Sequence, residues 1–362
     1  MIHVALVETV PSDSLGSMRR YADLIDQAFQ GSTEFRISRH ALAKRPQVKR
    51  WLPSRFGTLE HHACVYSRAR KLGRSPSADL FHVVDGSHGY VVPLLQSRPT
   101  VVTVHDVIPA LQVQGRFATT RPNSLAKVII DRALRGVMKA DAIVCVSEST
   151  RNDLQAIAGL GRNVSTLYSP LESLFALHNG QTNETDDKFI LHLGNNAFYK
   201  NRIGVIRTYI AIADKIPHRL IMAGPAPQDE HRALVAQAGL EERVEFMIHP
   251  SDDDVRRLYR QAALLLFPSV YEGFGWPPLE AMASGCAVVC SDSGSLPEIV
   301  GDAALMAPHN DVQALASQCL QVLKSESVAK DLVQRGLKQA GLFTIERFRD
   351  ELAAVYGKAV SS

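Results

Sequence analysis

Short apolar runs recur along the chain and alternate with longer stretches in which apolar residues lie three or four positions apart. The runs are typical of strands buried on both faces, and the longer stretches are typical of helices that cover a sheet. This alternation predicts an α/β fold with parallel sheets. The predicted strands are Ile2–Val7, Leu80–Val84, Val101–Val104, Ala142–Val146, Phe189–Leu193, Arg219–Met222, Val244–Met247, Leu264–Phe267 and Ala287–Cys290.

The polar segment 172–188 (ESLFALHNGQTNETDDK) interrupts the alternation near the middle of the chain. It is acidic and lacks periodicity, so it is the candidate linker between two domains. A chain of 362 residues is long enough for both. We therefore expect two Rossmann-like domains, over residues 1–175 and 176–343, followed by a last amphipathic helix over Thr344–Tyr356. The apolar face of that helix is formed by Ile345, Phe348, Leu352 and Val355.

The composition, 46% hydrophobic and 21% charged, is that of an ordinary globular protein. No apolar run approaches the ~20 residues that cross a bilayer, and the start MIHVALVETV lacks the pattern of a signal peptide. We therefore expect a cytoplasmic protein. The five cysteines form no CxxC pair and indicate neither a disulfide framework nor a zinc site.

The stretch Ala263–Gly301 carries the strongest signal for chemistry. It predicts a buried strand, a Gly-rich loop at residues 272–275, a helix opened by two prolines, and a second buried strand. The N–H groups at such a helix start can hold an anion. Glu272 and Glu280, with seven residues between them, can accept hydrogen bonds from a polyol. On spacing alone, a plain turn is as good an interpretation as a ligand site.

The segment EGFGWPPLEAMASGCAVVCSDSGSLPE resembles the donor-site signature of the family 4 retaining glycosyltransferases, in which two Glu residues flank a Gly-Phe-Gly turn. The resemblance implies the GT-B fold, in which two Rossmann-like domains face each other across a cleft. It also implies that the terminal segment 344–362 crosses back onto the N-terminal domain. No cofactor or metal ion is expected, and the chain has no Asp-x-Asp motif to bind a metal.

The resemblance assigns the donor-binding residues to strand ends in the second domain. Glu272 would hold hydroxyls of the transferred sugar, and Glu280 would hold those of the ribose. Lys200 would neutralise the diphosphate. The family usually offers an Arg beside this Lys, and Arg202 is our candidate for it. The further expected donor-binding residues are Gly16, Asn196, Gly224, Gly273, Phe274 and Gly275.

Candidates in the first domain also follow predicted strands. His105 and Asp106 end one strand, and a His there is more often structural, but the resemblance implies that His105 approaches the donor sugar. Asp85, Ser87 and His88 follow another strand and are acceptor-side candidates, as is Asp106. Ordinary loop polarity explains them equally well, and a plain turn is the alternative for the loop at Gly16. The predicted catalytic residues are His105, Glu272 and Lys200.

The segment 39–74 holds ten Lys or Arg against one Glu, interleaved with Trp51, Leu52 and Phe56. Such a segment suits an anionic membrane surface, which would place the protein peripherally at the inner membrane face, next to a lipid-linked acceptor. A solvated basic face and a site for an anionic acceptor are the alternatives. No nucleic-acid-binding motif accompanies the charge, so no nucleic-acid partner is expected.

We expect a retaining hexosyltransferase that takes a sugar from a nucleotide-sugar donor to a hydroxyl of a glycan or a lipid-linked acceptor. The segment GSLPEIVGDAAL is similar to bacterial mannosyl- and rhamnosyltransferases, so GDP-mannose is favoured over UDP-hexoses. The alternatives are a nucleotide-sugar epimerase or phosphorylase of the same fold, and a non-catalytic sugar-nucleotide-binding subunit. A dinucleotide oxidoreductase is disfavoured because no G-x-G-x-x-G follows the first strand.

Overall fold

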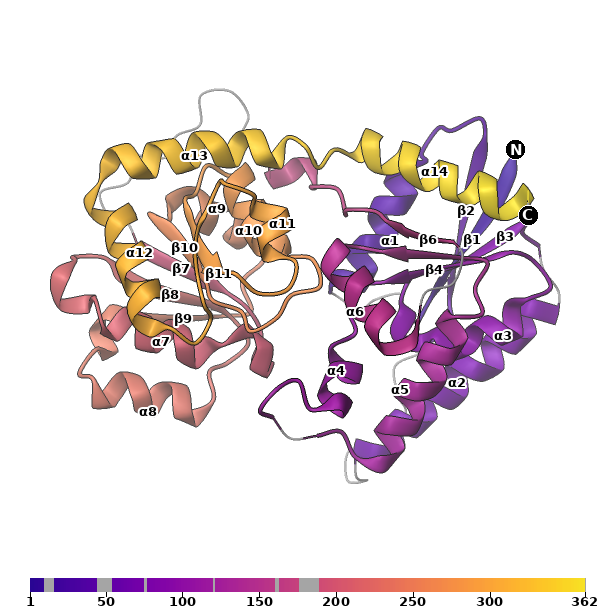
Figure 1. The fold of residues 1–362 in the computed structure, drawn as a ribbon, viewed down its shortest axis with the longest axis horizontal. Helices are drawn as coiled ribbons and strands as arrows, with labels where there is room; N and C mark the ends of the chain where they lie inside the picture. Colours follow the sequence, from indigo (N-terminus) through magenta and orange to yellow (C-terminus); the bar gives the residue numbers. More distant parts are fainter. Residues whose placement is uncertain are drawn as a thin grey trace. The chain divides into compact units, whose positions relative to one another are not determined.

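The chain folds into two compact units, each built on an open parallel sheet (Figure 1). Unit 1 comprises Met1–Pro170 and Ile345–Ser362, and unit 2 comprises Leu171–Thr344. The predicted α/β class with parallel sheets is confirmed. The computed structural model describes residues 1–9, 16–43, 54–74, 77–119, 121–159, 163–175 and 189–361.

The sheet of unit 1 has six parallel strands in the order β2-β1-β3-β4-β5-β6. The strand order reverses between β1 and β3, and ligands of open α/β sheets bind beyond the carboxyl ends of strands at such a reversal. Asp85, Ser87 and His88 follow β3 at this point. The strands are β1 (Ile2–Glu8), β2 (Phe35–Ala41), β3 (Leu80–Val83), β4 (Thr100–Val104), β5 (Ala142–Cys145) and β6 (Val164–Thr166).

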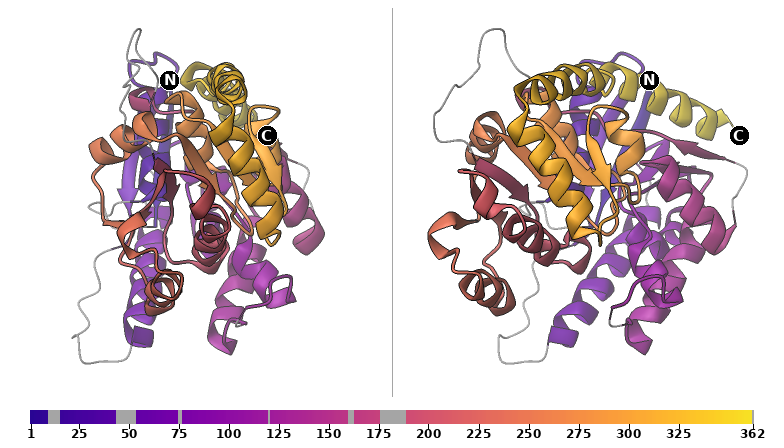
Figure 2. Two further views of the ribbon diagram at one scale, coloured as in Figure 1. Left: turned by 90° about the vertical axis from the view of Figure 1, so that its left-hand side faces the viewer. Right: turned by 60° about the vertical axis from the view of Figure 1, so that its left-hand side comes forward.

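Helices cover both faces of this sheet (Figures 1 and 2). The helices α1 and α14 pack together on one face, whereas α2, α3, α5 and the 3-10 helix η1 form a connected group. The helical elements of unit 1 are α1 (Ser17–Ala28), α2 (Ser54–Arg74), η1 (Gly86–Val91), α3 (Val92–Leu95), α4 (Ile108–Gln114), α5 (Ser124–Val137), α6 (Glu148–Ala158) and α14 (Ile345–Ser361).

The last helix, α14, belongs to unit 1 although it follows unit 2 in the sequence. Its side chains Phe348, Leu352 and Val355 are buried in the core beside strands β1, β3 and β4. This is the apolar face that the sequence predicts, so the return of the terminal helix to the N-terminal domain is confirmed. Tyr356, which the pattern did not place on that face, is also fully buried.

Four fully buried polar side chains tie α14 to the sheet. The Tyr356 hydroxyl lies 2.7 Å from His82 Nδ1, and His82 Nε2 lies 2.8 Å from Thr103 Oγ1. Thr103 Oγ1 lies 3.2 Å from the Tyr21 hydroxyl. Burial, together with the nearby His105, lowers the pKa of His82 to about 3, so its ring stays neutral at pH 7. Hydrogen bonds as well as apolar packing therefore hold the returning helix.

The sheet of unit 2 also has six parallel strands, in the order β12-β11-β10-β7-β8-β9. Here the order reverses between β7 and β10, so the loops after these two strands meet at the reversal. The strands are β7 (Phe189–Leu193), β8 (Arg219–Gly224), β9 (Val244–Ile248), β10 (Leu264–Phe267), β11 (Val288–Ser291) and β12 (Leu305–Ala307).

In unit 2, α7 and α12 contribute buried side chains to the hydrophobic core. The helices α9 and α10 also contact strands of the sheet. Ser251 caps α9, with its hydroxyl accepting from Asp254 N. The helical elements are η2 (Ser173–Phe175), η3 (Phe198–Lys200), α7 (Arg202–Ile210), η4 (Ala213–Lys215), α8 (Asp229–Gln237), η5 (Glu241–Arg243), α9 (Asp252–Gln261), α10 (Trp276–Ala283), α11 (Leu296–Val300), α12 (Val312–Lys324) and α13 (Glu326–Ala340).

The basic segment 39–74 is only partly described. Arg39, counted there among its positive charges, binds Glu8 with Nη2–Oε2 at 2.7 Å and also binds Asp23. The hydrogen bond to Glu8 raises the pKa of Arg39. Arg39 is therefore a structural cation and not a free one. Residues 44–53 lie outside the described part of the chain, and within the described part no helix is long and apolar enough to cross a membrane.

Replacing Tyr356 with Phe removes a hydroxyl and leaves His82 Nδ1 buried without its partner. An unsatisfied buried group costs about 1–3 kcal/mol, and for a domain of this size each kcal/mol lowers the melting temperature by roughly 2–4 °C. We expect Tyr356→Phe to melt roughly 2–12 °C lower by circular dichroism. Tyr66→Phe is the control, since this ring is 47% exposed. Equal melting temperatures of the two variants would contradict the assigned role of the hydroxyl.

Candidate active site

The loops that follow β7 and β10 bring together a lysine and a carboxylate. Lys200, at the end of η3, places Nζ 2.8 Å and 2.9 Å from the two carboxylate oxygens of Glu272. The two side chains are only 14% and 8% exposed. Because each carboxylate oxygen receives a charged donor, the orientation of Glu272 is fixed. The fold thus joins two predicted site residues at the reversal point of unit 2.

A Gly-Ser pair after β11 holds the Glu272 loop in place. Ser295 N donates to the Glu272 carbonyl at 3.1 Å, and Ser295 Oγ lies 2.6 Å from the Phe274 carbonyl. Gly294 has φ +60°, and a Cβ there would lie 2.5 Å from Glu272 O. Only glycine allows this approach, so the position of Glu272 depends on Gly294 as well as on Lys200.

The helix α10 begins directly after this loop. Gly275, its N-cap, has φ +110°, a conformation that favours glycine. The two prolines of the first turn have no N–H, so the backbone donors near this helix start belong to residues 273–276. Glu280 lies on α10, is 2% exposed, and accepts a hydrogen bond of 3.0 Å from the Tyr259 hydroxyl on α9. Its carboxylate is therefore also oriented by a buried donor.

Arg202 opens α7 as a buried cation. Its Nη1 donates to Asn196 Oδ1 and, at 3.1 Å, to the Pro225 carbonyl. Its Nε and Nη2 are buried and have no hydrogen-bond partner among the described residues. Burial lowers the pKa of Arg202. Buried guanidinium donors without partners are costly, so an anion at this position would be stabilised.

Asn196 and Gly224 shape the loop that carries Arg202. The amide of Asn196 accepts from Arg202 and donates to Ala226 O at 2.8 Å. Gly224 has φ +148°, and a Cβ there would lie 2.3 Å from Gly194 O. Both residues support the strand-end loops of β7 and β8, and within the described ranges Asn196 makes no side-chain hydrogen bond beyond these two.

His105 follows β4 in unit 1. Its Nε2 lies 2.8 Å from Val84 O, and its ring packs edge-on against Tyr21 with the ring centres 4.7 Å apart. Burial lowers its pKa, against the raising effects of Asp85 and of the Val84 carbonyl. A neutral ring that donates from Nε2 keeps the Nδ1 lone pair as an acceptor. His105 is thus placed to accept a hydrogen bond, not to carry a positive charge.

The three acceptor-side candidates after β3 lie together around one buried carboxylate. Asp85 accepts from Ser87 N at 2.9 Å, from His88 Nδ1 at 3.1 Å and from Thr9 Oγ1 at 3.2 Å. Burial raises its pKa, but the hydrogen bond and charge of His88 and the bond from Ser87 outweigh this and hold it below its ordinary value. Asp85 is therefore ionised.

Two predicted residues have local structural partners. Asp106 is exposed and accepts from Ile108 N at 2.9 Å, which starts α4. Gly16 is the N-cap of α1 with φ +147°, and the loop 10–15 before it lies outside the described residues. The structure therefore gives Asp106 a local turn contact at the start of α4.

Two models of known protein families match this chain, one for each unit. The model of "Glycosyltransferase Family 4" matches residues 24–171, and that of "Glycosyl transferases group 1" matches residues 176–339. Together they account for most of both units. The chain belongs to the family 4 glycosyltransferases.

Two curated relatives of this glycosyltransferase are mannosyltransferases of Escherichia coli. O-antigen chain mannosyltransferase B is 36% identical over 172 residues, which is 46% of this chain and 45% of that protein. The serotype-specific mannosyltransferase WbdA is 27% identical over 323 residues, which is 81% of this chain and 38% of that protein. The chain thus spans less than half of the length of these relatives.

Solved structures show the same fold. Sucrose-phosphate synthase from Thermosynechococcus elongatus is similar over all of both chains, with a TM-score of 0.83 and 20% identity. Anabaena Alr3699/HepE, solved in complex with UDP-glucose, matches 99% of this chain and 100% of its own, with a TM-score of 0.74 and 16% identity. This glycosyltransferase therefore has the GT-B fold that the sequence predicts.

Sequence reasoning missed four residues around the candidate site of unit 2 in this glycosyltransferase. Gly294, Ser295 and Tyr259 position the two carboxylates, as described above. His192 on β7 donates from Nδ1 to Leu266 O at 3.1 Å, and its Nε2 is buried without a partner in the described chain. Burial lowers the pKa of His192 to about 3. The Gly-Ser turn before Leu296-Pro297 was the available signal for the first two, since it lies within the segment that carries the resemblance.

Gly294→Ala would push a Cβ into the backbone of Glu272. We expect this variant to lose at least tenfold in kcat/KM for sugar transfer, because the Glu272 loop must shift. Gly239→Ala is a matched control: Gly239 has φ +64°, close to the +60° of Gly294, but a Cβ there meets nothing within 4 Å. The control should show only the backbone cost, about 1–2 kcal/mol of stability. Equal activity of the two variants would show that the contact with Glu272 is unimportant.

Proposed function

We propose that this glycosyltransferase transfers a hexose, mannose in preference, from a nucleotide-diphosphate sugar to a hydroxyl of a glycan or a lipid-linked acceptor, with retention of configuration. The observation that carries the proposal is the buried Lys200–Glu272 pair at the reversal point of the unit 2 sheet. The mannosyltransferase relatives support the choice of sugar, and the UDP-glucose complex of a protein with the same fold supports a nucleotide-sugar donor.

The donor-side cations suit a diphosphate leaving group. The Lys200 ammonium has three N–H donors and turns two of them to Glu272, so one remains for a phosphate oxygen. Arg202 adds two buried donors that have no partner in the described chain. Backbone N–H groups of the 273–275 loop complete the set. Charge that develops on the diphosphate as the glycosidic bond breaks would be stabilised by these fixed groups.

The carboxylates suit hydroxyl groups. Each oxygen of Glu272 has lone-pair capacity beyond its bond to Lys200, which is available to hydroxyls of the transferred sugar. Glu280, held by Tyr259, would accept from the ribose hydroxyls. In unit 1, the Nδ1 atom of a neutral His105 would accept from a substrate hydroxyl. None of these groups needs to gain or lose a proton during transfer.

Retention follows if the acceptor hydroxyl attacks from the face that the diphosphate leaves. The bond from the anomeric carbon to the phosphate oxygen breaks, the bond to the acceptor oxygen forms, and the acceptor proton passes to the departing phosphate. A dedicated general base and a metal ion are then unnecessary. A lipid-linked acceptor would suit a cytoplasmic enzyme that meets the inner membrane face through the basic segment 39–74.

A panel of nucleotide sugars tests the donor. We expect GDP-mannose to raise the melting temperature more than UDP-, ADP- or dTDP-sugars, because a ligand at 100 times its Kd stabilises the native state by about 2.7 kcal/mol. Transfer from an α-linked donor, without added Mg²⁺ or Mn²⁺, should give an α-linked product by NMR. A panel in which no nucleotide sugar shifts the melting temperature would contradict donor binding. A β-linked product would contradict retention. Transfer only to water or phosphate would favour a phosphorylase.

Two substitutions separate the roles of the buried pair. Glu272→Gln should weaken binding of the nucleotide sugar at least tenfold and leave binding of the free nucleoside diphosphate nearly unchanged, because Glu272 faces the sugar. Lys200→Met should weaken both ligands, because Lys200 faces the phosphates. Lys324→Met, an exposed lysine on α12, is the control. Isothermal titration gives the affinities. Equal losses for both ligands in Glu272→Gln would refute the assignment of this residue to the sugar.

A further inference from the structure

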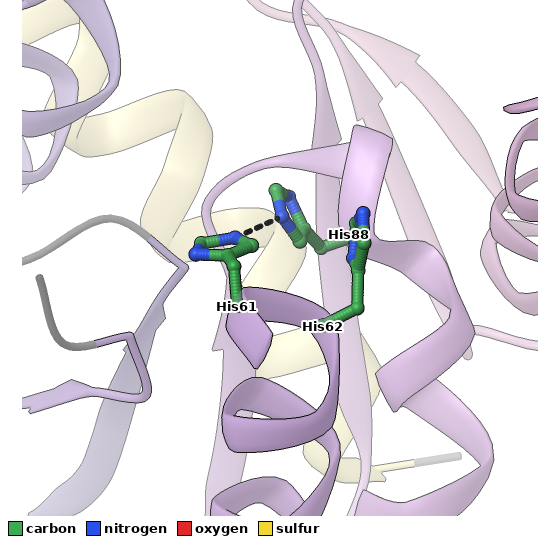
Figure 3. Close-up of side chains that lie close together, drawn as sticks. All are labelled: His61, His62 and His88. Atoms are coloured by element: carbon green, nitrogen blue, oxygen red, sulfur yellow. Dashed lines mark hydrogen bonds between the residues drawn. The ribbon is translucent and has the colours of Figure 1, made fainter. Parts of the chain in front are cut away.

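Three histidines gather in unit 1, outside the donor-side residues. His61 and His62 are consecutive on α2, and His88 lies in η1 (Figure 3). The Nε2 atoms of His61 and His88 are 3.1 Å apart, and one ring nitrogen from each of the three residues lies within 4.8 Å of the others. All three are half-buried. The cluster is therefore compact and still reachable from solvent.

The fold fixes the position of His88. Asp85 caps η1 at the carboxyl end of β3, where the sheet order reverses. On its other side η1 packs closely against α5: a Cβ on Gly89 would lie 2.4 Å from Ala133 O, and one on Gly136 would lie 2.0 Å from Gly89 O. η1 also contacts α2, which carries His61. His88 is thus presented to α2 from a rigid turn.

Two of the rings have an outer partner that sets the nitrogen they present. In the neutral form of His88, Nδ1 donates to Asp85 at 3.1 Å, so Nε2 is the acceptor nitrogen that faces His61. His62 Nδ1 lies 2.7 Å from the Tyr90 hydroxyl, which leaves Nε2 for any other contact. A carboxylate or other oxygen on the far nitrogen is the usual arrangement of histidines that bind a metal.

We propose that His61, His62 and His88 bind a zinc ion. Imidazole nitrogens suit Zn²⁺, and tetrahedral bonds of 2.0–2.1 Å place ligand nitrogens about 3.3 Å apart, close to the 3.1 Å between His61 and His88. The ligand nitrogen of His62 lies within 4.8 Å of those of His61 and His88. The fourth position is open to water or to an oxygen ligand. This inference does not rest on the proposed sugar transfer.

The ion would join α2 to the loop after β3. Among the described residues, α2 and this loop are connected by contacts of His61 and His62 with His88 and Tyr90, and by packing of α2 against η1 and α3. Metal binding in this position adds its free energy to the folded state alone, because the unfolded chain does not hold the three rings together. We therefore expect zinc binding to stabilise the folded form of unit 1.

Zinc binding is tested on untagged full-length protein that has been treated with EDTA and desalted. We expect ZnSO₄ titrated by calorimetry to show one saturable site per chain. His88→Asn and His61→Asn should each lower the affinity at least tenfold. The control is His249→Asn, because His249 is exposed and has φ +51°, a conformation that Asn adopts. Titration without a saturable site, or unchanged affinity in both cluster variants, would overturn the proposal.

Asp85→Asn separates a metal site from a merely hydrogen-bonded cluster. It should keep the stoichiometry and weaken the zinc affinity by about 10–100-fold, as loss of an outer partner typically does. Melting curves without metal establish that each variant is folded, and zinc should raise the melting temperature of the wild type but not of His88→Asn. If His88→Asn does not fold, Co²⁺ spectra decide: tetrahedral bands in the wild type and their absence in folded His61→Asn support the site, and bands in both overturn it.

Discussion

The buried ion pair between Lys200 and Glu272 is the interaction on which the candidate site of unit 2 depends. Two charges this far from water are tolerated only when each satisfies the other, so neither residue can be lost alone without leaving an unpaired charge. The partners are 72 residues apart in the sequence. They meet because the sheet places β10 directly beside β7 and reverses its order there. The chemistry of the site is therefore a consequence of strand order.

In unit 1 too, a buried charged side chain lies where the strand order reverses, but it is a carboxylate without a cationic partner among the described lysines and arginines. The reversal lies between β1 and β3, and the buried carboxylate of Asp85 stands there, bonded to Thr9 beyond the end of β1. No lysine or arginine pairs with Asp85 in the described structure. Its charge is met by hydrogen-bond donors, of which His88 is the titratable one. The Asp85 carboxylate stabilises a positive charge on the His88 ring. A proton or a bound metal ion can supply that charge.

The sequence predicted the central strands of the two sheets better than their edge strands. All nine predicted strands exist, whereas β2, β6 and β12 were missed, and each of these lies at a sheet edge. Edge strands are short or polar because one side lacks a partner strand, so they show no continuous apolar run. The placement of Lys200 and Glu272 was predictable because both residues follow clear strands, whereas their assignment to a ligand site came from the family resemblance. The histidine cluster was not, since consecutive helix residues such as His61 and His62 do not share a face, and only the fold brings His88 to them.

Arg202 shows that a candidate site residue can be unfavourable for folding. A cation in the first turn of a helix opposes the helix dipole, burial adds a desolvation cost, and no carboxylate pairs with it among the described residues. Asn196 and Pro225 satisfy only one of its nitrogens. Each of these features lowers the stability of unit 2, and a bound anion would offset all three at once. The simplest physical account is that the ligand supplies the partner that the protein omits.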